Sequence, residues 1–189
     1  STSAVSTATI TDDLVNITNS NQTVIYTVTP TSSGTNTCVG EPFTVTVTVY
    51  PEPQGYDDNT VVSCSDIPLT YDLQANVDNT TNGGNAVPST FSWVATANAN
   101  VTGESTSAVS TATITDDLVN ITNSNQTVIY TVTPTSSGIS TFVGSPFTVT
   151  VTVYPEPHGY DDNTVVSCSD IQLNYVLQAT VDNTKHGEN

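Results

Sequence analysis

The stretch FTVTVTVYPEP decides the fold, because it occupies residues 43–53 and recurs letter for letter at residues 147–157. Its valines alternate with threonines, and successive side chains of a strand point to opposite faces. Both residue types are β-branched and fit a pleated sheet, while the two prolines remove backbone donors and end the strand. The stretch therefore predicts a half-buried β-strand that closes a structural unit.

The recurrence extends along the whole chain. At an offset of 104 positions, residues 1–85 align with residues 105–189, and only 12 of these 85 pairs differ. This period is much longer than the roughly 20–50 residues of a solenoid repeat and suits a β-sandwich domain of about 100 residues. If the run Tyr-Pro-Glu-Pro closes each unit, residues 1–53 are the rear part of one unit, 54–157 a complete unit and 158–189 the front part of the next. An isolated part of a sandwich would expose sheet edges, and the chain begins without a methionine, so we expect it to be an interior piece of a longer polypeptide.

The complete unit is predicted to be all-β, an antiparallel sandwich. Alternating apolar residues between turn-forming segments predict strands at residues 61–64, 69–77, 90–95, 107–114, 127–134 and 147–154, with a short one near Val101. No segment shows a helical apolar period over three turns. Trp93, with Phe91 beside it on a central strand, is the expected core residue.

The charge balance restricts the partners. One Lys or Arg stands against 18 Asp and Glu, a formal net charge of −17. The chain lacks the cations that neutralise phosphates, so nucleic-acid binding and attraction to anionic membranes are excluded. No apolar run approaches the ~20 residues of a membrane-spanning helix, so we expect no membrane insertion in this segment.

Two strand motifs carry a family resemblance. The run LVNITNSNQTVIYTVTPTSSG at residues 118–138, followed by VGSPFTVTVTVYPEP at 143–157, resembles the PKD-like, immunoglobulin-like repeats of very large secreted surface proteins in the Bacteroidota. The resemblance implies a secreted or cell-surface protein, often exported by the type IX system and in some cases linked to adhesion or gliding. It implies no particular ligand, because the fold hosts many functions.

The resemblance also implies a cysteine pair in each unit, one early and one just before the final strand. Cys64 and Cys168 hold the early position and Cys38 the late one, but the late position of the complete unit is Phe142. Cys64 thus loses its expected partner. A bridge from Cys38 to Cys64 across the domain junction is one alternative, although connectivity cannot be deduced from sequence.

The best chemical candidate is the junction PEPQGYDDNT at residues 51–60, repeated as PEPHGYDDNT at 155–164. Ca²⁺ takes six to eight oxygen ligands in tolerant geometry, and a short loop with glycine and several acids supplies them. A neighbouring loop, Asp12–Asp13 or Asp116–Asp117, would complete the shell. The alternative is a solvated acidic linker that keeps the array soluble, since no strict ligand motif is present. The candidate ligands are Glu52, Asp57, Asp58, Asn59, Glu156, Asp161, Asp162 and Asn163.

Catalysis has little support in the sequence. The histidines are His158 and His186, and the aligned positions of the other copy hold Gln54 and Asn82. A histidine-dependent site would therefore not be a property of the repeat, and no nucleophile and base stand in a recognisable arrangement. We expect the protein not to be an enzyme. Calcium, considered above, is the one candidate cofactor.

The repeat indicates a structural role. Near-identical sandwiches joined by short, proline-stiffened linkers make an extended stalk or fibre, so we expect an adhesive or structural repeat of a large bacterial extracellular protein whose partners are neighbouring copies of the same repeat. Two alternatives stay open. One is a glycan-binding module that uses an exposed aromatic such as Tyr56 or Tyr160. The other is a filament subunit in which another chain of the same fibre donates a strand to an incomplete domain.

Overall fold

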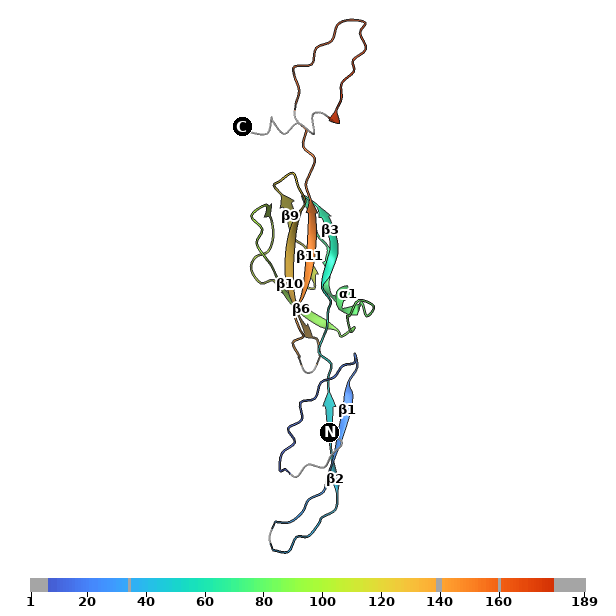
Figure 1. The fold of residues 1–189 in the computed structure, drawn as a ribbon, viewed down its shortest axis with the longest axis vertical. Coiled ribbons are helices and arrows are strands. Elements are labelled where there is room, and N and C mark those ends of the chain that lie inside the picture. Colours follow the sequence, from blue (N-terminus) through green and yellow to red (C-terminus); the bar gives the residue numbers. More distant parts are fainter. Residues whose placement is uncertain (1–6, 34, 139–140, 160, 179–189) are drawn as a thin grey trace.

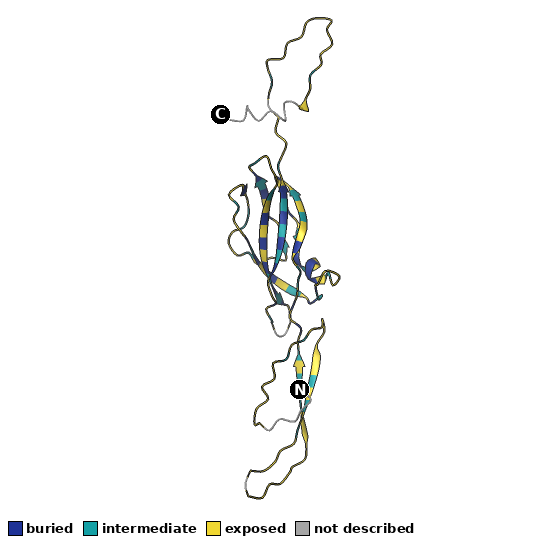
Figure 2. Cartoon of the chain, in the orientation of Figure 1, coloured by how far each residue is buried: buried dark blue, intermediate teal, exposed yellow. Residues whose placement is uncertain are grey.

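The computed structural model describes residues 7–33, 35–138, 141–159 and 161–178. Three parts follow one another along the long axis: an N-terminal hairpin, a middle unit and a C-terminal segment (Figure 1). Among the described residues, the buried hydrophobic side chains all lie between Leu69 and Val153, in the middle unit (Figure 2). The predicted boundaries of the complete unit, residues 54–157, enclose this core and stay a prediction.

The principal sheet of the middle unit contains the stretch that recurs in the sequence. Its strand order is β3 (Asp58–Cys64), β11 (Phe147–Tyr154), β10 (Gln126–Ser136) and β6 (Ser89–Ala95). The pairs β11–β10 and β10–β6 are antiparallel, as the predicted sandwich requires. The pair β3–β11 is parallel, because the first and last long strands of the unit both run away from the N-terminal hairpin (Figure 1).

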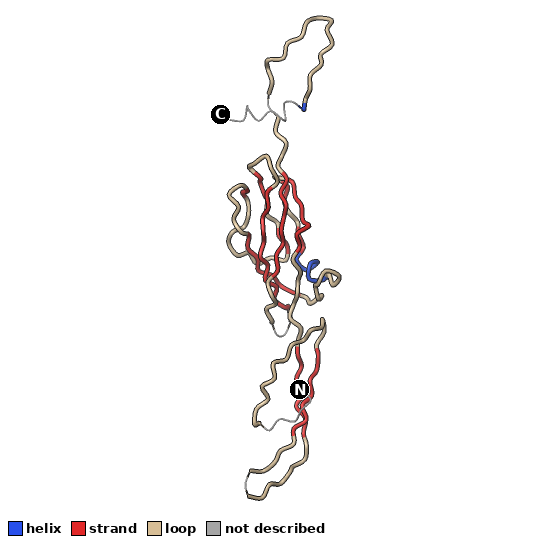
Figure 3. Tube along the Cα trace, in the orientation of Figure 1, coloured by secondary structure: helices blue, strands red, loops and turns tan. Residues whose placement is uncertain are grey.

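A second layer of short strands covers the inner face of this sheet (Figure 3). It comprises β4 (Ile67–Pro68), β9 (Asp117–Asn120) and β7 (Val101–Thr102) in that order, and the pair β5 (Tyr71–Asp72) with β8 (Thr113–Ile114). One helix, α1 (Leu73–Asp78), follows β5 directly. No helix among the described residues is long and apolar enough to cross a membrane.

The predicted core residues are buried between the layers. Trp93 is 2% exposed and Phe91 is also buried. The ring of Tyr130 meets Trp93 edge to face, with centroids 5.6 Å apart and planes at 73°. The valines of β10 and β11 complete the centre of the core, as their alternation with threonine predicts. The all-β prediction is therefore confirmed, apart from one short helix.

Two strand predictions were wrong in part. Residues 69–77 form a strand only at Tyr71–Asp72 and then turn into α1, whose first turn is capped by the Asp72 carboxylate accepting from the backbone of Gln74 and Ala75. A helix of six residues is too short to show a helical period over three turns. Residues 107–114 are a paired strand only at Thr113–Ile114, with an isolated bridge from Val109 to Trp93.

The N-terminal hairpin repeats the pairing of β10 and β11. Strands β1 (Gln22–Val28) and β2 (Phe43–Val49) are antiparallel, and Val24 faces Val47 across the pair. The residues 104 positions later, Val128 and Val151, pair in the same way. The hairpin valines are only half-buried, because the elements that cover β10 and β11 have no counterpart there among the described residues.

Candidate functional site

The junction between the hairpin and the middle unit is the most elaborate structure outside the core. Pro51 and Pro53 of the linker are buried. The carbonyl oxygen of Pro53 lies against Gly144, where a Cβ atom would stand only 1.9 Å from it. Because glycine has no Cβ, it permits this close approach of two backbones. The linker is therefore packed onto the middle unit.

Asn85 fastens the linker by three hydrogen bonds. Its side-chain nitrogen donates to the Glu52 carbonyl at 2.7 Å, and its side-chain oxygen accepts from the Gln54 backbone nitrogen at 2.8 Å. Its own backbone nitrogen donates to the Gln54 carbonyl at 3.2 Å. One side chain thus satisfies a donor and an acceptor of a linker in which the prolines offer no donors.

An aromatic pair also joins the hairpin to the middle unit. Tyr50 follows β2, and Phe142 lies in the loop between β10 and β11. Their rings stack with centroids 5.8 Å apart and planes at 23°. Stacked aromatic pairs contribute about 0.5–1.5 kcal/mol beyond the area they bury. The stack therefore adds a direct contact between the hairpin and the middle unit.

Asn76 of α1 connects the linker to the start of β3. Its side chain accepts from the backbone nitrogen of Tyr56 and donates to the Tyr56 carbonyl, both at 3.0 Å, and it also donates to the Tyr71 hydroxyl at 2.9 Å. The Tyr71 hydroxyl in turn donates to the carboxylate of Asp58 at 2.9 Å. Burial raises the pKa of Tyr71, so this hydroxyl keeps its proton in neutral solution.

Both Asp57 and Asp58 accept hydrogen bonds from the protein, although Asp57 is exposed and Asp58 is buried. The Asp57 carboxylate accepts from the backbone nitrogen and the hydroxyl of Thr148, at 2.7 and 3.0 Å, and so ties the linker to β11. The Asp58 carboxylate accepts from the backbone and hydroxyl of Thr60. Burial alone would raise the pKa of Asp58, but the hydrogen bonds from Thr60 and Tyr71 outweigh it, and the pKa lies below its usual value.

The candidate calcium ligands thus differ in their surroundings: some are exposed, and others accept hydrogen bonds from the protein. Glu52 and Asn59 are exposed, whereas Asp57 and Asp58 are engaged as described. In the second copy of the motif the Asp162 carboxylate accepts from Thr164. The remaining candidates of that copy, all exposed, are Glu156, Asp161 and Asn163. No group of three His, Cys, Asp or Glu side chains within the described ranges is placed to hold a metal ion, and calcium binding stays a prediction.

The acidic loops considered as additional ligands have different surroundings. Asp116 is buried in the middle unit, where it accepts from the backbone and hydroxyl of Ser105, each at 2.7 Å, and from the Tyr130 hydroxyl at 2.9 Å. Asp12 of the hairpin accepts from Tyr26 in the same way, at 3.0 Å. Asp116 therefore belongs to the inside of the middle unit, whereas Asp12, Asp13 and Asp117 are exposed.

Cys38, Cys64 and Cys168 are free and exposed. Cys38 precedes β2 and Cys64 ends β3, and the two strands run in the same direction along the long axis (Figure 1). Each strand has seven residues and spans roughly 20 Å, far beyond the ~7 Å Cα separation that a disulfide tolerates. The predicted bridge from Cys38 to Cys64 is therefore not made within the chain in this structure.

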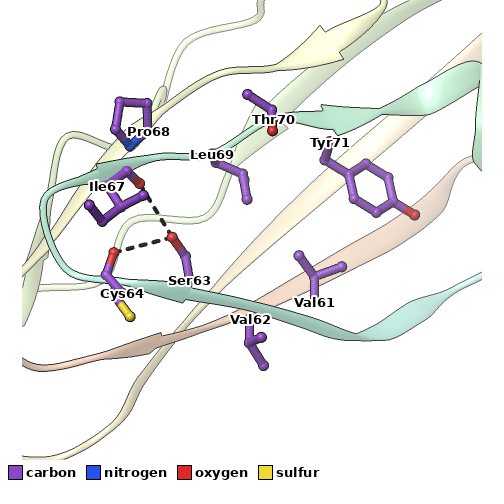
Figure 4. Close-up of a pocket in the computed structure, with 9 residues that line it drawn as sticks. All are labelled: Val61, Val62, Ser63, Cys64, Ile67, Pro68, Leu69, Thr70 and Tyr71. Carbon is purple, nitrogen blue, oxygen red and sulfur yellow. Dashed lines mark hydrogen bonds between the residues drawn. The ribbon is translucent and has the colours of Figure 1, made fainter.

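A shallow groove of about 340 Å³ runs along the outer edge of the middle unit, between β3 and residues 67–71 (Figure 4). The Ser63 hydroxyl lies near the Cys64 and Ile67 carbonyls at the turn, and the Cys64 sulfur points away from Leu69. Tyr56, the aromatic considered for glycan binding, lies elsewhere: it is half-buried, and its hydroxyl accepts from Asn79 at 3.3 Å. Tyr160 lies outside the described residues.

Sequence reasoning located the junction but missed the residues that make it. Asn85, Gly144 and Phe142 are distant from the linker in sequence, and no local pattern singles them out. The run Asn-Gly-Gly-Asn at 82–85 signals only a turn. One signal was usable in retrospect: Gly144 and Gly40 occupy the same place in the two copies, although the residues around them differ.

A family model described as a PKD-like domain matches residues 1–53 and 61–157, most of the chain. The match covers both the hairpin and the middle unit. No curated protein matches the chain.

Proposed function

The chain belongs to the PKD-like domain family, and on that premise we propose that it is a structural repeat of an extended extracellular stalk. Domains of this kind are immunoglobulin-like, typically extracellular and typically non-catalytic. The finer assignment is a fibre of a large bacterial surface protein, exported by the type IX route and adhesive as a whole. The observation that best supports this proposal is that the linker at the junction packs against the middle unit.

A stalk keeps an extended shape only if its joints resist bending. The linker here is held by two buried prolines, the three hydrogen bonds of Asn85, the close packing on Gly144 and the stack of Tyr50 on Phe142. A flexible Gly- or Ser-rich linker would have none of these. Such a joint favours a fixed angle between successive units.

The surface chemistry supports an extracellular location. The formal net charge of −17 on 189 residues keeps parallel stalks apart by mutual repulsion and favours solubility. A single Lys or Arg leaves one cleavage site for trypsin-like proteases. Glycan recognition, the alternative from a different class, has no support at Tyr56, whose hydroxyl is engaged by Asn79.

Small-angle X-ray scattering on the full chain tests the joint. The Tyr50→Ala variant removes the stack without changing the middle unit, and Gly144→Ala forces the linker off its surface. We expect both to shift the scattering from a rod toward a flexible ensemble. Gly40→Ala is the matched control, because a Cβ there meets only Pro30, no closer than 3.0 Å, and no linker.

Two results would contradict the proposal. The first is a wild-type profile that is already flexible. The second is a profile left unchanged by Tyr50→Ala and Gly144→Ala while Trp93 fluorescence shows the middle unit folded. Recording the same profiles in calcium and in EDTA tests the metal: a rod that becomes flexible in EDTA supports a bound cation at Glu52, Asp57 and Asp58.

A further inference from the structure

The turn that follows α1 protrudes from the side of the middle unit and contains an Asn-Gly sequence (Figure 1). Asn82–Gly83 is the only such pair in the 189 residues, and both of its members are exposed. An asparagine carboxamide can be attacked by the backbone nitrogen of the next residue, and the side chain of that residue normally obstructs the attack. Glycine has no side chain, so this obstruction is absent at Asn82.

The two groups that would react are the Gly83 backbone nitrogen and the Asn82 carboxamide. Within the described residues neither of them takes part in a hydrogen bond, although other groups of the turn are paired. The space around Gly83 is open, because a Cβ atom there would meet only the Cβ of Tyr56, at 3.8 Å. The nitrogen and the carboxamide are therefore both free to approach each other.

The base of the turn is fixed to the middle unit. The Asn79 carbonyl accepts from the backbone nitrogens of Asn82 and Gly84, at 3.2 and 3.0 Å. Gly84 is buried, and Asn85 follows it directly with its three hydrogen bonds to the linker. Asn82 thus lies at the exposed tip of a turn, three residues before the side chain that fastens the linker.

We propose that Asn82 is a site of spontaneous deamidation, at which the exposed Asn82–Gly83 pair passes through a cyclic succinimide to aspartate and isoaspartate. The Gly83 nitrogen bonds to the carboxamide carbon of Asn82 and gives up its proton to solvent. The bond from that carbon to the side-chain nitrogen breaks, and the nitrogen leaves as ammonia. Water then opens the ring at either carbonyl carbon, so the net reaction consumes one water and releases one ammonia.

The two products change the turn in different ways. Aspartate adds a negative charge and keeps the backbone, whereas isoaspartate carries the chain through its side-chain methylene and lengthens the backbone by one atom. Because the base of the turn is fixed at Asn79 and Gly84, the extra atom displaces the residues beside it. We expect Asn85 to be shifted and its hydrogen bonds to the linker to weaken. The joint between the hairpin and the middle unit then loosens as the protein ages.

The repeat supplies a matched control for this site. His186 occupies the counterpart of Asn82, while Gly187 and Asn189 match Gly83 and Asn85. Asn82→His therefore removes the reactive carboxamide with a residue that occurs at this position in the other copy. The inference goes beyond the stalk proposed above and does not depend on it, because it concerns one turn of the middle unit.

Incubation of the full chain in mildly alkaline buffer at physiological temperature tests the reaction. Mass spectrometry of peptic peptides should show conversion of the amide to an acid at Asn82. Asn19 and Asn123, which precede serines, should be converted much more slowly. Hydroxylamine attacks a succinimide, so it should cleave the chain between Asn82 and Gly83 and leave Asn82→His intact.

The same conversion is measured for the chain unfolded in urea. We expect the folded and unfolded proteins to react at rates within about tenfold of each other. A larger protection in the folded protein would overturn the proposal, because it would mean that the turn holds the two groups apart. Equal conversion at Asn82 and Asn123 would overturn it as well.

Trp93 fluorescence in urea tests the effect on the joint. Aged wild-type protein should have a lower urea midpoint than fresh protein, whereas Asn82→His aged for the same time should not. Fresh Asn82→Asp carries the charge without the longer backbone and should keep the midpoint of fresh protein. A midpoint that stays unchanged after Asn82 is converted would refute the loosening of the joint. The scattering test of the stalk uses fresh protein, so the two proposals fail separately.

Discussion

Val151→Ala and Val47→Ala make the same change at the same place in two copies of one strand. Val151 is fully buried in the middle unit, while Val47 is half-buried in the hairpin. Removing two buried methyl-sized groups costs about 1.6 kcal/mol of transfer free energy, at about 0.8 kcal/mol each. The cavity left behind raises the loss to about 2–3 kcal/mol. For Val47→Ala we expect a change in the stability of the middle unit within about 0.5 kcal/mol.

Trp93 makes the measurement selective. It is the only tryptophan of the chain and lies in the core of the middle unit, so its fluorescence in urea follows the unfolding of that unit alone. With a denaturant slope of about 1–2 kcal/mol per molar urea, Val151→Ala should lower the midpoint by about 1–3 M, and Val47→Ala should leave it nearly unchanged. Equal shifts of the two variants would refute the reasoning, because they would mean that the hairpin and the middle unit unfold as one body.

The remaining predictions use the same fluorescence. The pKa of Asp58 is lowered in the folded state, so its ionised carboxylate stabilises the fold above its unfolded pKa, and this stabilisation is lost as the pH falls through the folded value. Asp58→Asn should therefore flatten the dependence of the urea midpoint on pH below about pH 4. Burial, and next the charge of Asp116, raise the pKa of the Tyr130 hydroxyl in the folded state. The stability that this shift contributes is therefore present below the unfolded pKa of tyrosine and is lost as the pH rises above it. Tyr130→Phe should reduce the fall of the urea midpoint above about pH 10, and an unchanged fall would contradict this assignment. Asn85→Ala removes two side-chain hydrogen bonds to the linker and should reduce the free energy of unfolding of the middle unit by about 1–3 kcal/mol. An unchanged free energy would mean that the linker does not pack on the middle unit in solution.

The long strands of the fold could be predicted from the sequence, and the short ones could not. The alternation in residues 147–154 identifies β11, because apolar and polar residues follow one another with a period of two along the strand. Strand β4, by contrast, has two residues, and the pairing of Ile67 with Leu118 is decided by the sandwich as a whole. Helix α1 depends on a cap from Asp72 and on burial of Leu73 and Val77, which leave no periodic signal in six residues.

The candidate site divides in a similar way. Its acids were visible because Glu52, Asp57 and Asp58 cluster in the sequence, and their composition suggested a cation. The structure instead gives Asp57 and Asp58 hydroxyl and amide donors from Thr148, Thr60 and Tyr71. Threonine is so frequent in this chain that no spacing could single out the ones that act as partners. Long-range pairing, separated by 91 residues for Asp57 and Thr148, is a property of the topology.

The two copies share most of the residues that form the joint but differ at one of them. The residues that dock the linker are repeated: Tyr50 and Tyr154, Gly40 and Gly144, and Asn85 and Asn189 are identical pairs. The residue that caps the joint is not, because Phe142 stands where the other copy has Cys38. In one copy this residue, Phe142, stacks on Tyr50, and in the other it is the free, exposed Cys38. Because cysteine cannot form the aromatic stack, the stack belongs to the joint between the hairpin and the middle unit, whereas the close approach at the glycine and the hydrogen bonds of the asparagine depend on residues that both copies carry.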